Sequence, residues 1–166
     1  MWEKLFSDVD IKQENVHIPD GLNPDWKKTC AEYERSIRSA GGIDLQILGL
    51  GPNGHIGFNE PGSPFDSRTR LVELSEATIR ANASDFPDGN PATHAITMGM
   101  GTILEAEAIL LLVTGDGKAE VLQQALEGPI DEKMPASALR THRNVIVLAD
   151  KAAARHLSRK TRKGIV

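Results

Sequence analysis

Residues 47–63 read ILGLGPNGHIGFNEPGS, and this stretch decides the fold and the site that the sequence predicts. A short apolar run gives way to closely spaced glycines and then to polar side chains, among them His55 and Glu60. Glycine tolerates backbone angles and close approaches that other residues resist, so polar side chains set among glycines indicate a site held at the end of a strand. We expect that strand over residues 44–50. Because ligands of open α/β sheets bind beyond the carboxyl ends of the strands, the loop that follows is the expected binding site.

The same stretch also satisfies a glycine pattern of dinucleotide-binding proteins. Residues 49–54 read GLGPNG, which matches G-x-G-x-x-G. That pattern needs a helix that begins at the third glycine, so that its free amides can hold a pyrophosphate. Gly57 and Pro61 follow too closely for such a helix. The sequence therefore disfavours a nicotinamide or flavin site, and we predict no cofactor.

Apolar periodicity and turn residues predict the other elements of the fold. Further strands are expected over 94–98, 108–114 and 144–149, and helices over 75–83, 99–105 and 118–127. Strands that alternate with helices at this spacing predict an α/β fold with a mostly parallel sheet flanked by helices. The run AILLLVT at 108–114 predicts a central strand that is buried on both faces.

The N-terminal quarter carries weaker signals. Residues 1–9 place apolar side chains on one helical face, which predicts a helix, through Trp2, Leu5, Phe6 and Val9. A short strand is expected over 15–19. The next helix is predicted to have Asn23 as its cap and to end at Gly41.

Composition limits the class of protein. With 166 residues and 40% hydrophobic side chains, the chain can form one domain with one core, and we treat residues 1–166 as a single domain. Cys30 is the only cysteine, which suits a reducing cytoplasm. The basic segment 151–166 lacks interleaved aromatic residues and follows an acidic body, so nucleic-acid binding is not expected. Neither a membrane span nor a secretion signal is expected from the pattern of apolar runs.

The stretch at 51–61 closely resembles the active-site segment of glucosamine-6-phosphate deaminases, also called glucosamine-6-phosphate isomerases. That family carries G-x-[DN]-G-H-I-x-F-N-E-P after a sheet strand, and this chain has GPNGHIGFNEP. The resemblance continues through SRTRLVELSEATIRAN at 67–82, AITMGMGTILEAEAILLLVTGDGKAE at 95–120 and MPASAL at 134–139. It implies a Rossmann-like fold and the conversion of glucosamine 6-phosphate and water to fructose 6-phosphate and ammonia.

The residue types in this loop suit the first step of that reaction. Histidine exchanges a proton near neutral pH, so His55 is the predicted acid/base for opening the sugar ring. Glu60 and Asn53 can fix the tautomer and orientation of its ring through hydrogen bonds. Histidine, glutamate and asparagine could also suggest a metal site, but the resemblance implies metal-free chemistry and no cysteine lies nearby. We therefore predict no metal.

A second loop, TGDGKAE at 114–120, contains the other predicted binding residue. A lysine in the first turn of a helix is opposed by the helix dipole, which makes sense if an anion sits between Lys118 and the free amides of the turn. The alternative is a solvated lysine. The resemblance favours the anion, since family members hold the substrate phosphate with the matching lysine. Gly51 and Gly54 complete the predicted substrate-binding set.

Two departures from the family pattern affect the expected activity. The family's N-terminal portion, with a phosphate loop and an aspartate that acts as the C1–C2 base, has no counterpart in this sequence, and Ser84 stands where an arginine usually helps to bind phosphate. The chain as given is therefore expected to turn over substrate poorly. Strands without those partners would leave apolar faces uncovered, so a homo-oligomer is expected.

Three alternatives remain at this point. Galactosamine-6-phosphate deaminases are close in chemistry, and 6-phosphogluconolactonases are related but usually lack the FNEP continuation seen at 58–61. The third alternative is a non-catalytic module that binds a sugar phosphate or supports oligomerisation. Binding of an amino-sugar phosphate without release of ammonia would select this last alternative.

Overall fold

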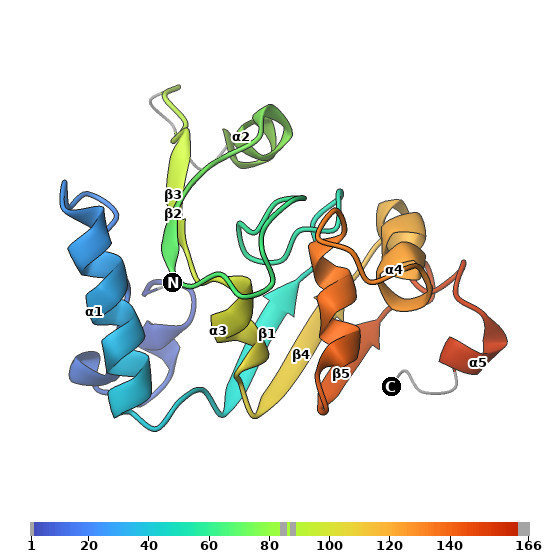
Figure 1. Ribbon diagram of the computed structural model, residues 1–166, viewed down its shortest axis with the longest axis horizontal. Helices are drawn as coiled ribbons and strands as arrows, with labels where there is room; N and C mark the ends of the chain where they lie inside the picture. Colours follow the sequence, from blue (N-terminus) through green and yellow to red (C-terminus); the bar gives the residue numbers. More distant parts are fainter. Residues whose placement is uncertain (1, 84–85, 87–88, 163–166) are drawn as a thin grey trace.

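Three short aliphatic runs form a parallel sheet at the centre of the protein. The computed structural model describes residues 2–83, 86 and 89–162. The sheet has the order β1-β4-β5, with β1 at Leu45–Gly49, β4 at Ala108–Val113 and β5 at Val145–Ala149 (Figure 1). Both pairings are parallel, and each strand is reached through a helical connection. The predicted parallel sheet with flanking helices is confirmed.

One face of this sheet carries the hydrophobic core. Leu48, Leu111 and Val147 lie side by side across the three strands, because each is paired with the next in the register. Helices α3 (Met100–Leu104), α4 (Ala119–Glu127) and the 3-10 helix η5 (Pro135–Thr141) supply the opposing apolar side chains. Ile109 and Leu111 are fully buried there. The core therefore fixes β4 between its two neighbours and sets where the strand ends lie.

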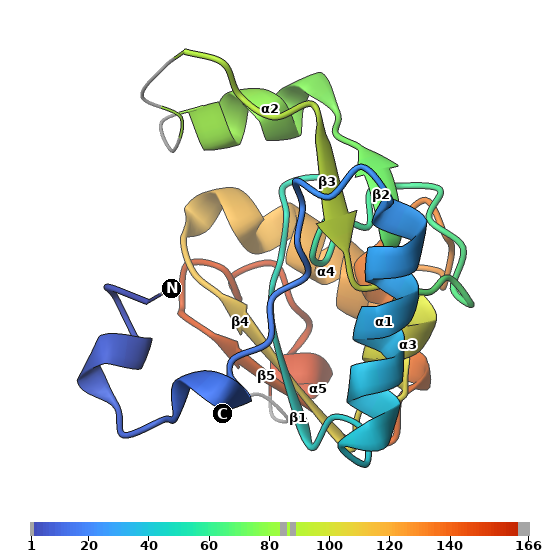
Figure 2. The same ribbon diagram turned by 90° about the vertical axis from the view of Figure 1, so that its left-hand side faces the viewer.

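The opposite face of the sheet is open among the described residues. Its apolar side chains form rows across the strands and are between 36% and 56% exposed, at Leu45, Ile47, Leu112, Ile146 and Leu148. The prediction that 108–114 is buried on both faces is therefore wrong. Burial alternates along β4 because α3, α4 and η5 pack on one side only. In Figure 2, α3 lies on one side of the sheet and the N-terminal segment on the other.

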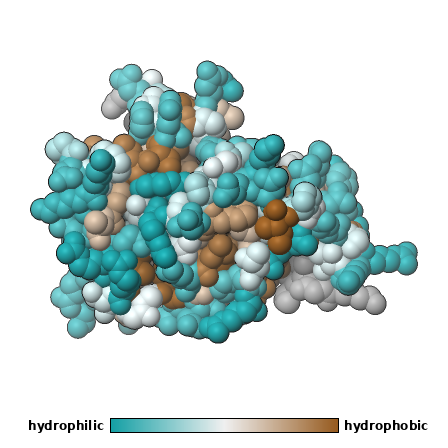
Figure 3. All heavy atoms as spheres, in the orientation of Figure 1, coloured by the Kyte–Doolittle hydropathy of each residue, from teal (hydrophilic) through white to brown (hydrophobic). Residues whose placement is uncertain are grey.

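An antiparallel arm stands apart from the sheet. Strands β2 (Arg70–Glu73) and β3 (His94–Thr97) pair with each other and lead to α2 (Glu76–Asn82), which lies at the far end of the arm (Figures 1 and 2). Ser75 caps α2, since its hydroxyl accepts a hydrogen bond from the amide of Thr78. Hydrophobic atoms on the face shown in Figure 3 gather in part where this arm meets the body.

The N-terminal predictions are wrong. The predicted helix over 1–9 is a turn with a 3-10 helix η1 at Phe6–Asp8, and residue 1 lies outside the described residues. The predicted strand over 15–19 is extended chain after a second 3-10 helix, η2 at Gln13–Asn15. The segment has no cap and little packing, with Trp2 46% exposed, so its apolar spacing lacks the burial that stabilises a helix.

Helix α1 (Trp26–Ser39) is present where the sequence predicts a helix, but its cap differs. Asp25, not Asn23, is the N-cap, and Asn23 instead accepts a hydrogen bond from the amide of Asp25. Gly41 follows the helix with a φ of 96°, which suits glycine. Toward the C-terminus the structure adds the 3-10 helix η4 (Asp116–Lys118) and the short α5 (Arg159–Arg162). No helix in the described part of the chain has the length and apolar character of a membrane span.

A buried carboxylate ties α1 to the rest of the fold. Glu34 is 7% exposed and accepts hydrogen bonds from the amide and hydroxyl of Thr69 and from the hydroxyl of Thr102. Burial alone would raise the pKa of Glu34, but these donors outweigh it and lower the pKa. The ionised form is therefore the one that joins α1 to β2 and α3.

We expect Glu34→Gln to lower the free energy of unfolding at neutral pH by roughly 1.5–3 kcal/mol, the range for hydrogen bonds to a charged group. Because the folded-state pKa of Glu34 is lowered, its contribution is present above its ordinary pKa of about 4.5 and is lost as pH falls below that value. Urea unfolding of both proteins between pH 3 and 7 measures this. Glu32→Gln, an exposed position on the same helix, is the control. Equal stabilities of wild type and Glu34→Gln at pH 7 would show that the Glu34 carboxylate does not stabilise the attachment of α1.

Candidate active site

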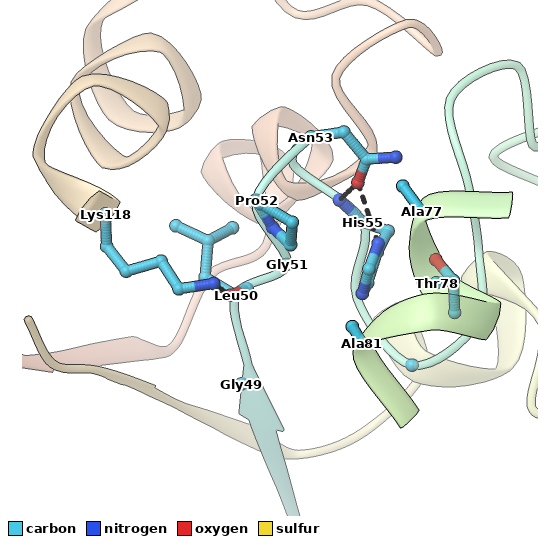
Figure 4. A pocket seen from close by; sticks show the side chains of 11 residues that line it. Gly49, Leu50, Gly51, Pro52, Asn53, His55, Ala77, Thr78, Ala81 and Lys118 are labelled. Atoms are coloured by element: carbon cyan, nitrogen blue, oxygen red, sulfur yellow. Dashed lines mark hydrogen bonds between the residues drawn. The ribbon is translucent and has the colours of Figure 1, made fainter. Parts of the chain in front are cut away.

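A cavity of ≈ 570 Å³ opens at the carboxyl end of β1. Its wall is formed by the glycine-rich loop at 49–57, by Ala77, Thr78 and Ala81 of α2, and by Lys118 at the start of α4 (Figure 4). The loop contains turns and no helix, which agrees with the rejection of a dinucleotide site. The cavity lies where the topology of an open α/β sheet predicts a ligand.

The three predicted catalytic side chains lie together beside this cavity. The Nδ1 atom of His55 is 2.7 Å from Oδ1 of Asn53, which also accepts a 3.3 Å hydrogen bond from the His55 amide (Figure 4). The Nδ2 group of Asn53 donates to Oε2 of Glu60 at 2.6 Å. Glu60 Oε2 is also 3.6 Å from His55 Nδ1. Asn53 thus lies between the imidazole and the carboxylate and contacts both.

This chain of contacts determines which nitrogen of His55 carries a hydrogen. An ionised carboxylate can only accept, so the Asn53 amide must turn its NH₂ group to Glu60 and its oxygen to His55. That oxygen can also only accept, so Nδ1 of His55 is the donor. In the neutral ring the other nitrogen, Nε2, then has a free lone pair. Among the described residues Nε2 has no hydrogen-bond partner, and the ring lines the cavity.

The protonation states of His55 and Glu60 follow from their burial and from the groups around them. Burial lowers the pKa of His55, and the charge of Lys118 lowers it further, while the charge of Glu60 opposes both. The pKa of Glu60 is also lowered, although burial alone would raise it, because Thr78, Asn53 and Ser75 donate hydrogen bonds to its carboxylate. At neutral pH the site therefore holds a neutral imidazole next to a carboxylate.

Lys118 reaches the same cavity from the second loop. Its Nζ atom donates to the carbonyl of Leu50 at 2.8 Å, and burial lowers its pKa. None of the ion pairs found in the described residues includes Lys118. It is the last residue of η4 and directly precedes α4, so its charge lies at the helix start as expected. The anion predicted there remains a prediction.

The two predicted binding glycines have a steric role in the structure. A Cβ atom on Gly51 would lie 2.3 Å from three atoms of the His55 ring, so only glycine lets the ring pack over this backbone. Gly54 has a φ of 85°, and a Cβ there would lie 2.0 Å from Sδ of Met134. Both glycines therefore shape the loop around His55. Contact with a substrate remains a prediction for each.

Two groups that hold the loop were given no role by the sequence. Asn59 is fully buried, donates to the carbonyls of Ile56 and Met98, and accepts from Arg70. On the other side of the loop, Thr78 and Ser75 of α2 donate to Oε1 of Glu60. The Ser75 cap was visible in the sequence as a helix start, but its contact with Glu60 depends on how the arm folds back.

The donor set around the cavity does not form a metal centre. No group of three or more histidine, cysteine, aspartate or glutamate side chains in the described part of the chain could hold a metal ion. The charged side chains near His55 are Glu60, whose Oε2 lies 3.6 Å from Nδ1 of the ring, and Lys118, which lines the same cavity.

Known proteins resemble this chain over nearly all of its length. The sequence model of the family described as glucosamine-6-phosphate isomerases/6-phosphogluconolactonase matches residues 1–148. The glucosamine-6-phosphate deaminase of Shouchella clausii is 50% identical over 155 residues, which cover 93% of this chain and 63% of that protein. Glucosamine-6-phosphate deaminase 2 of Bacillus subtilis is 50% identical over 161 residues, with 95% and 64% covered. The chain thus spans less than two thirds of the length of these relatives.

Solved structures agree with the fold. A monomeric glucosamine-6-phosphate deaminase superposes with a TM-score of 0.89 at 47% identity, over 94% of this chain and 65% of that chain. The 6-phosphogluconolactonase of Trypanosoma brucei superposes with a TM-score of 0.68 at 22% identity, over 95% and 66%, which shows the shared fold alone. Because the first of these is described as monomeric, it gives no support to the predicted homo-oligomer.

We expect Gly51→Ala to displace the His55 ring, because the added methyl group would overlap three ring atoms. The Nδ1 contact with Asn53 should then be lost, and the ¹⁵N signals of the ring should change from one dominant neutral tautomer to a mixture. Gly49→Ala is the matched control, since a Cβ there meets nothing within 4 Å. Unchanged ring signals in folded Gly51→Ala would show that the ring does not depend on this close approach.

Proposed function

Because the chain belongs to the glucosamine-6-phosphate isomerase/6-phosphogluconolactonase family, we propose that it supplies the ring-opening and phosphate-binding groups of a glucosamine-6-phosphate deaminase. The reaction converts glucosamine 6-phosphate and water to fructose 6-phosphate and ammonia. The observation that carries the proposal is the open Nε2 of His55, which is set by the Asn53 and Glu60 contacts and lies on the cavity that Lys118 also lines.

Ring opening needs one group that first accepts and then donates a proton. Neutral His55 can accept the proton of the anomeric hydroxyl at Nε2 while the bond between C1 and the ring oxygen breaks. The imidazolium then returns the proton to that oxygen, which leaves an open-chain aldehyde and a neutral ring. The nearby carboxylate of Glu60 stabilises the imidazolium that forms between the two steps.

Lys118 is the residue that we propose to bind the phosphate of the substrate. It is a cation on the cavity wall, and its hydrogen bond to the Leu50 carbonyl leaves two ammonium hydrogens for an anion. Partial burial strengthens the attraction between that ammonium group and a phosphate because screening by water is reduced. Gly51 lines the same cavity, and it is a proposed further contact of the substrate together with Gly54 of the same loop.

Identity to known proteins supports the deaminase over the other family activity. The relatives at 47–50% identity described above are glucosamine-6-phosphate deaminases, whereas the 6-phosphogluconolactonase described above is 22% identical and shares the fold. We further propose that the protein acts in the cytoplasm, which suits the unpaired and buried thiol of Cys30. The chain spans less than two thirds of the length of those relatives. Ring opening, for which this chain supplies His55, is therefore the step to test first.

We expect the protein to accelerate the exchange between the α and β anomers of glucosamine 6-phosphate, because that exchange passes through the open chain. Saturation-transfer NMR measures it without any need for release of ammonia. His55→Gln should lower the acceleration by roughly a hundredfold or more, the usual contribution of a general acid/base. Since the pKa of His55 is lowered, the wild-type rate should fall only below its ordinary value of about 6.5.

The control for this experiment is His94→Gln, an exposed histidine on β3. Galactosamine 6-phosphate and 6-phosphogluconolactone, measured in parallel, separate the alternative substrates. Binding of glucosamine 6-phosphate with no acceleration of anomer exchange would select the non-catalytic binding module. Equal acceleration by wild type and His55→Gln would remove His55 from the mechanism.

We also propose that the chain self-associates through the open sheet face. Parallel sheets are normally covered on both faces, and this one exposes rows of aliphatic side chains among the described residues. Sedimentation equilibrium at micromolar concentration should give a mass above the 18.0 kDa of one chain. Ile47→Lys should reduce the association, whereas Leu22→Lys, at a 94% exposed site elsewhere, should not. A monodisperse wild-type monomer would rule out this assembly.

A further inference from the structure

The carboxylate of Glu60 uses its two oxygens for different parts of the fold. Oε2 faces the loop, where it accepts from Asn53 and lies 3.6 Å from Nδ1 of His55. Oε1 faces α2, where it accepts from the hydroxyls of Ser75 and Thr78. Hydrogen bonds from the loop and from the arm together therefore fix the orientation of the Glu60 carboxylate.

Thr78 is the side chain on α2 that is best placed for this role. It is 4% exposed, although its neighbours Ala77 and Ala81 on the same wall of the cavity are exposed. Ser75 donates toward both Thr78 and Glu60 at 3.1 Å, while its own oxygen accepts from the Thr78 amide as the helix cap. The single hydrogen of Ser75 is thus shared between two acceptors, whereas the hydroxyl hydrogen of Thr78 is directed at Glu60.

We propose that Thr78 is a positioning residue, whose hydroxyl holds Glu60 so that Asn53 keeps His55 in the tautomer with Nε2 open to the cavity. The consequence for activity rests on the proposed function, but the consequence for the imidazole does not. If the hydroxyl is removed, Oε1 loses a donor and the carboxylate can turn about its last bond. Asn53 then has no fixed partner for its NH₂ group, and either nitrogen of His55 can carry the hydrogen.

The chain of contacts also sets the direction of the electrostatic change. The Thr78 hydrogen bond is the largest of the effects that lower the pKa of Glu60. Its loss should raise that pKa toward or above the ordinary value of 4.5, because burial alone disfavours the charged form. If the rise in the pKa of Glu60 comes from the lost hydrogen bond, a variant that keeps the hydroxyl at position 78 should not show it. The two kinds of variant therefore separate loss of the contact from a general loosening of α2.

The test compares Thr78→Val, which removes the hydroxyl at nearly constant volume, with Thr78→Ser, which keeps it. Thr29→Val is the control for loss of a hydroxyl at another buried helical threonine, on α1. ¹⁵N NMR of His55 reports its tautomer, and ¹³C NMR of the side-chain carboxyls, assigned with Glu60→Gln, reports the titration of Glu60. Anomer exchange of glucosamine 6-phosphate at pH 7 reports ring opening.

We expect Thr78→Val to mix the two tautomers, to raise the pKa of Glu60 and to slow anomer exchange about tenfold, the effect of one hydrogen bond to a charged group. Thr78→Ser should restore all three, and Thr29→Val should change none of them. Wild-type ring signals and wild-type titration of Glu60 in folded Thr78→Val would overturn the proposal. If wild type does not accelerate anomer exchange, the proposed function fails, while the two NMR measurements still decide the role of Thr78.

If Thr78→Val does not fold, the wild-type protein decides the question. The hydroxyl proton of Thr78 should be protected from exchange with water at low temperature, and its chemical shift should follow the titration of Glu60. A hydroxyl proton that exchanges rapidly, or whose shift is independent of Glu60, would overturn the proposal in the same way.

Discussion

The site depends on one fully buried amide, that of Asn59. Its NH₂ group donates to the carbonyls of Ile56 and Met98, and its oxygen accepts from Arg70. These three partners belong to the loop after β1, to the end of β3 and to the start of β2. A buried amide that lost any of them would be left with an unsatisfied polar group, which costs about 1–3 kcal/mol. The loop that carries His55 and Glu60 is therefore held to the arm by hydrogen bonds that water cannot replace, because the Asn59 amide is buried.

The arm and the sheet contribute differently to the cavity. The sheet fixes where β1 ends and brings Lys118 to the loop, because β1 and β4 are paired in parallel and both end at the same edge. The arm supplies α2, whose hydroxyls face the carboxylate and whose alanines leave space. The imidazole thus lies on a cavity whose wall comes partly from the sheet side and partly from a separate hairpin. A change in the position of α2 reaches His55 through three hydrogen bonds, which join Thr78 to Glu60, Glu60 to Asn53, and Asn53 to His55.

The charges near the cavity are compatible with both the proposed proton transfer and the proposed anion binding. Glu60 is ionised because donors surround it, and His55 is neutral because it is buried near a cation. Lys118 bonds a backbone carbonyl in place of a carboxylate, so no internal ion pair among the described residues neutralises it. In the proposed function, a phosphate would therefore meet the ammonium group of Lys118, and a sugar hydroxyl would meet Nε2 of His55.

The sequence by itself determined the strand before the loop, the helices after Ser75 and at 118–127, and the identity of the polar cluster. These are local properties: glycine spacing, a serine cap, and an apolar run long enough for one strand, and they need no knowledge of distant residues. The resemblance of 51–61 and 95–120 to one family added the expected roles of His55, Glu60 and Lys118. The same local rules failed over 1–9, because apolar spacing predicts a helix only where another surface buries it.

Tertiary structure decided what depends on residues far apart in the chain. The partners of Asn59 and Glu60 come from the arm, and the open face of β4 reflects which side α3 and α4 cover. The need for glycine at position 51 arises from the position of the His55 ring, which the sequence places four residues away without showing that it folds back. Such contacts depend on which surfaces pack together in three dimensions, and the pattern of residues along the chain does not show this.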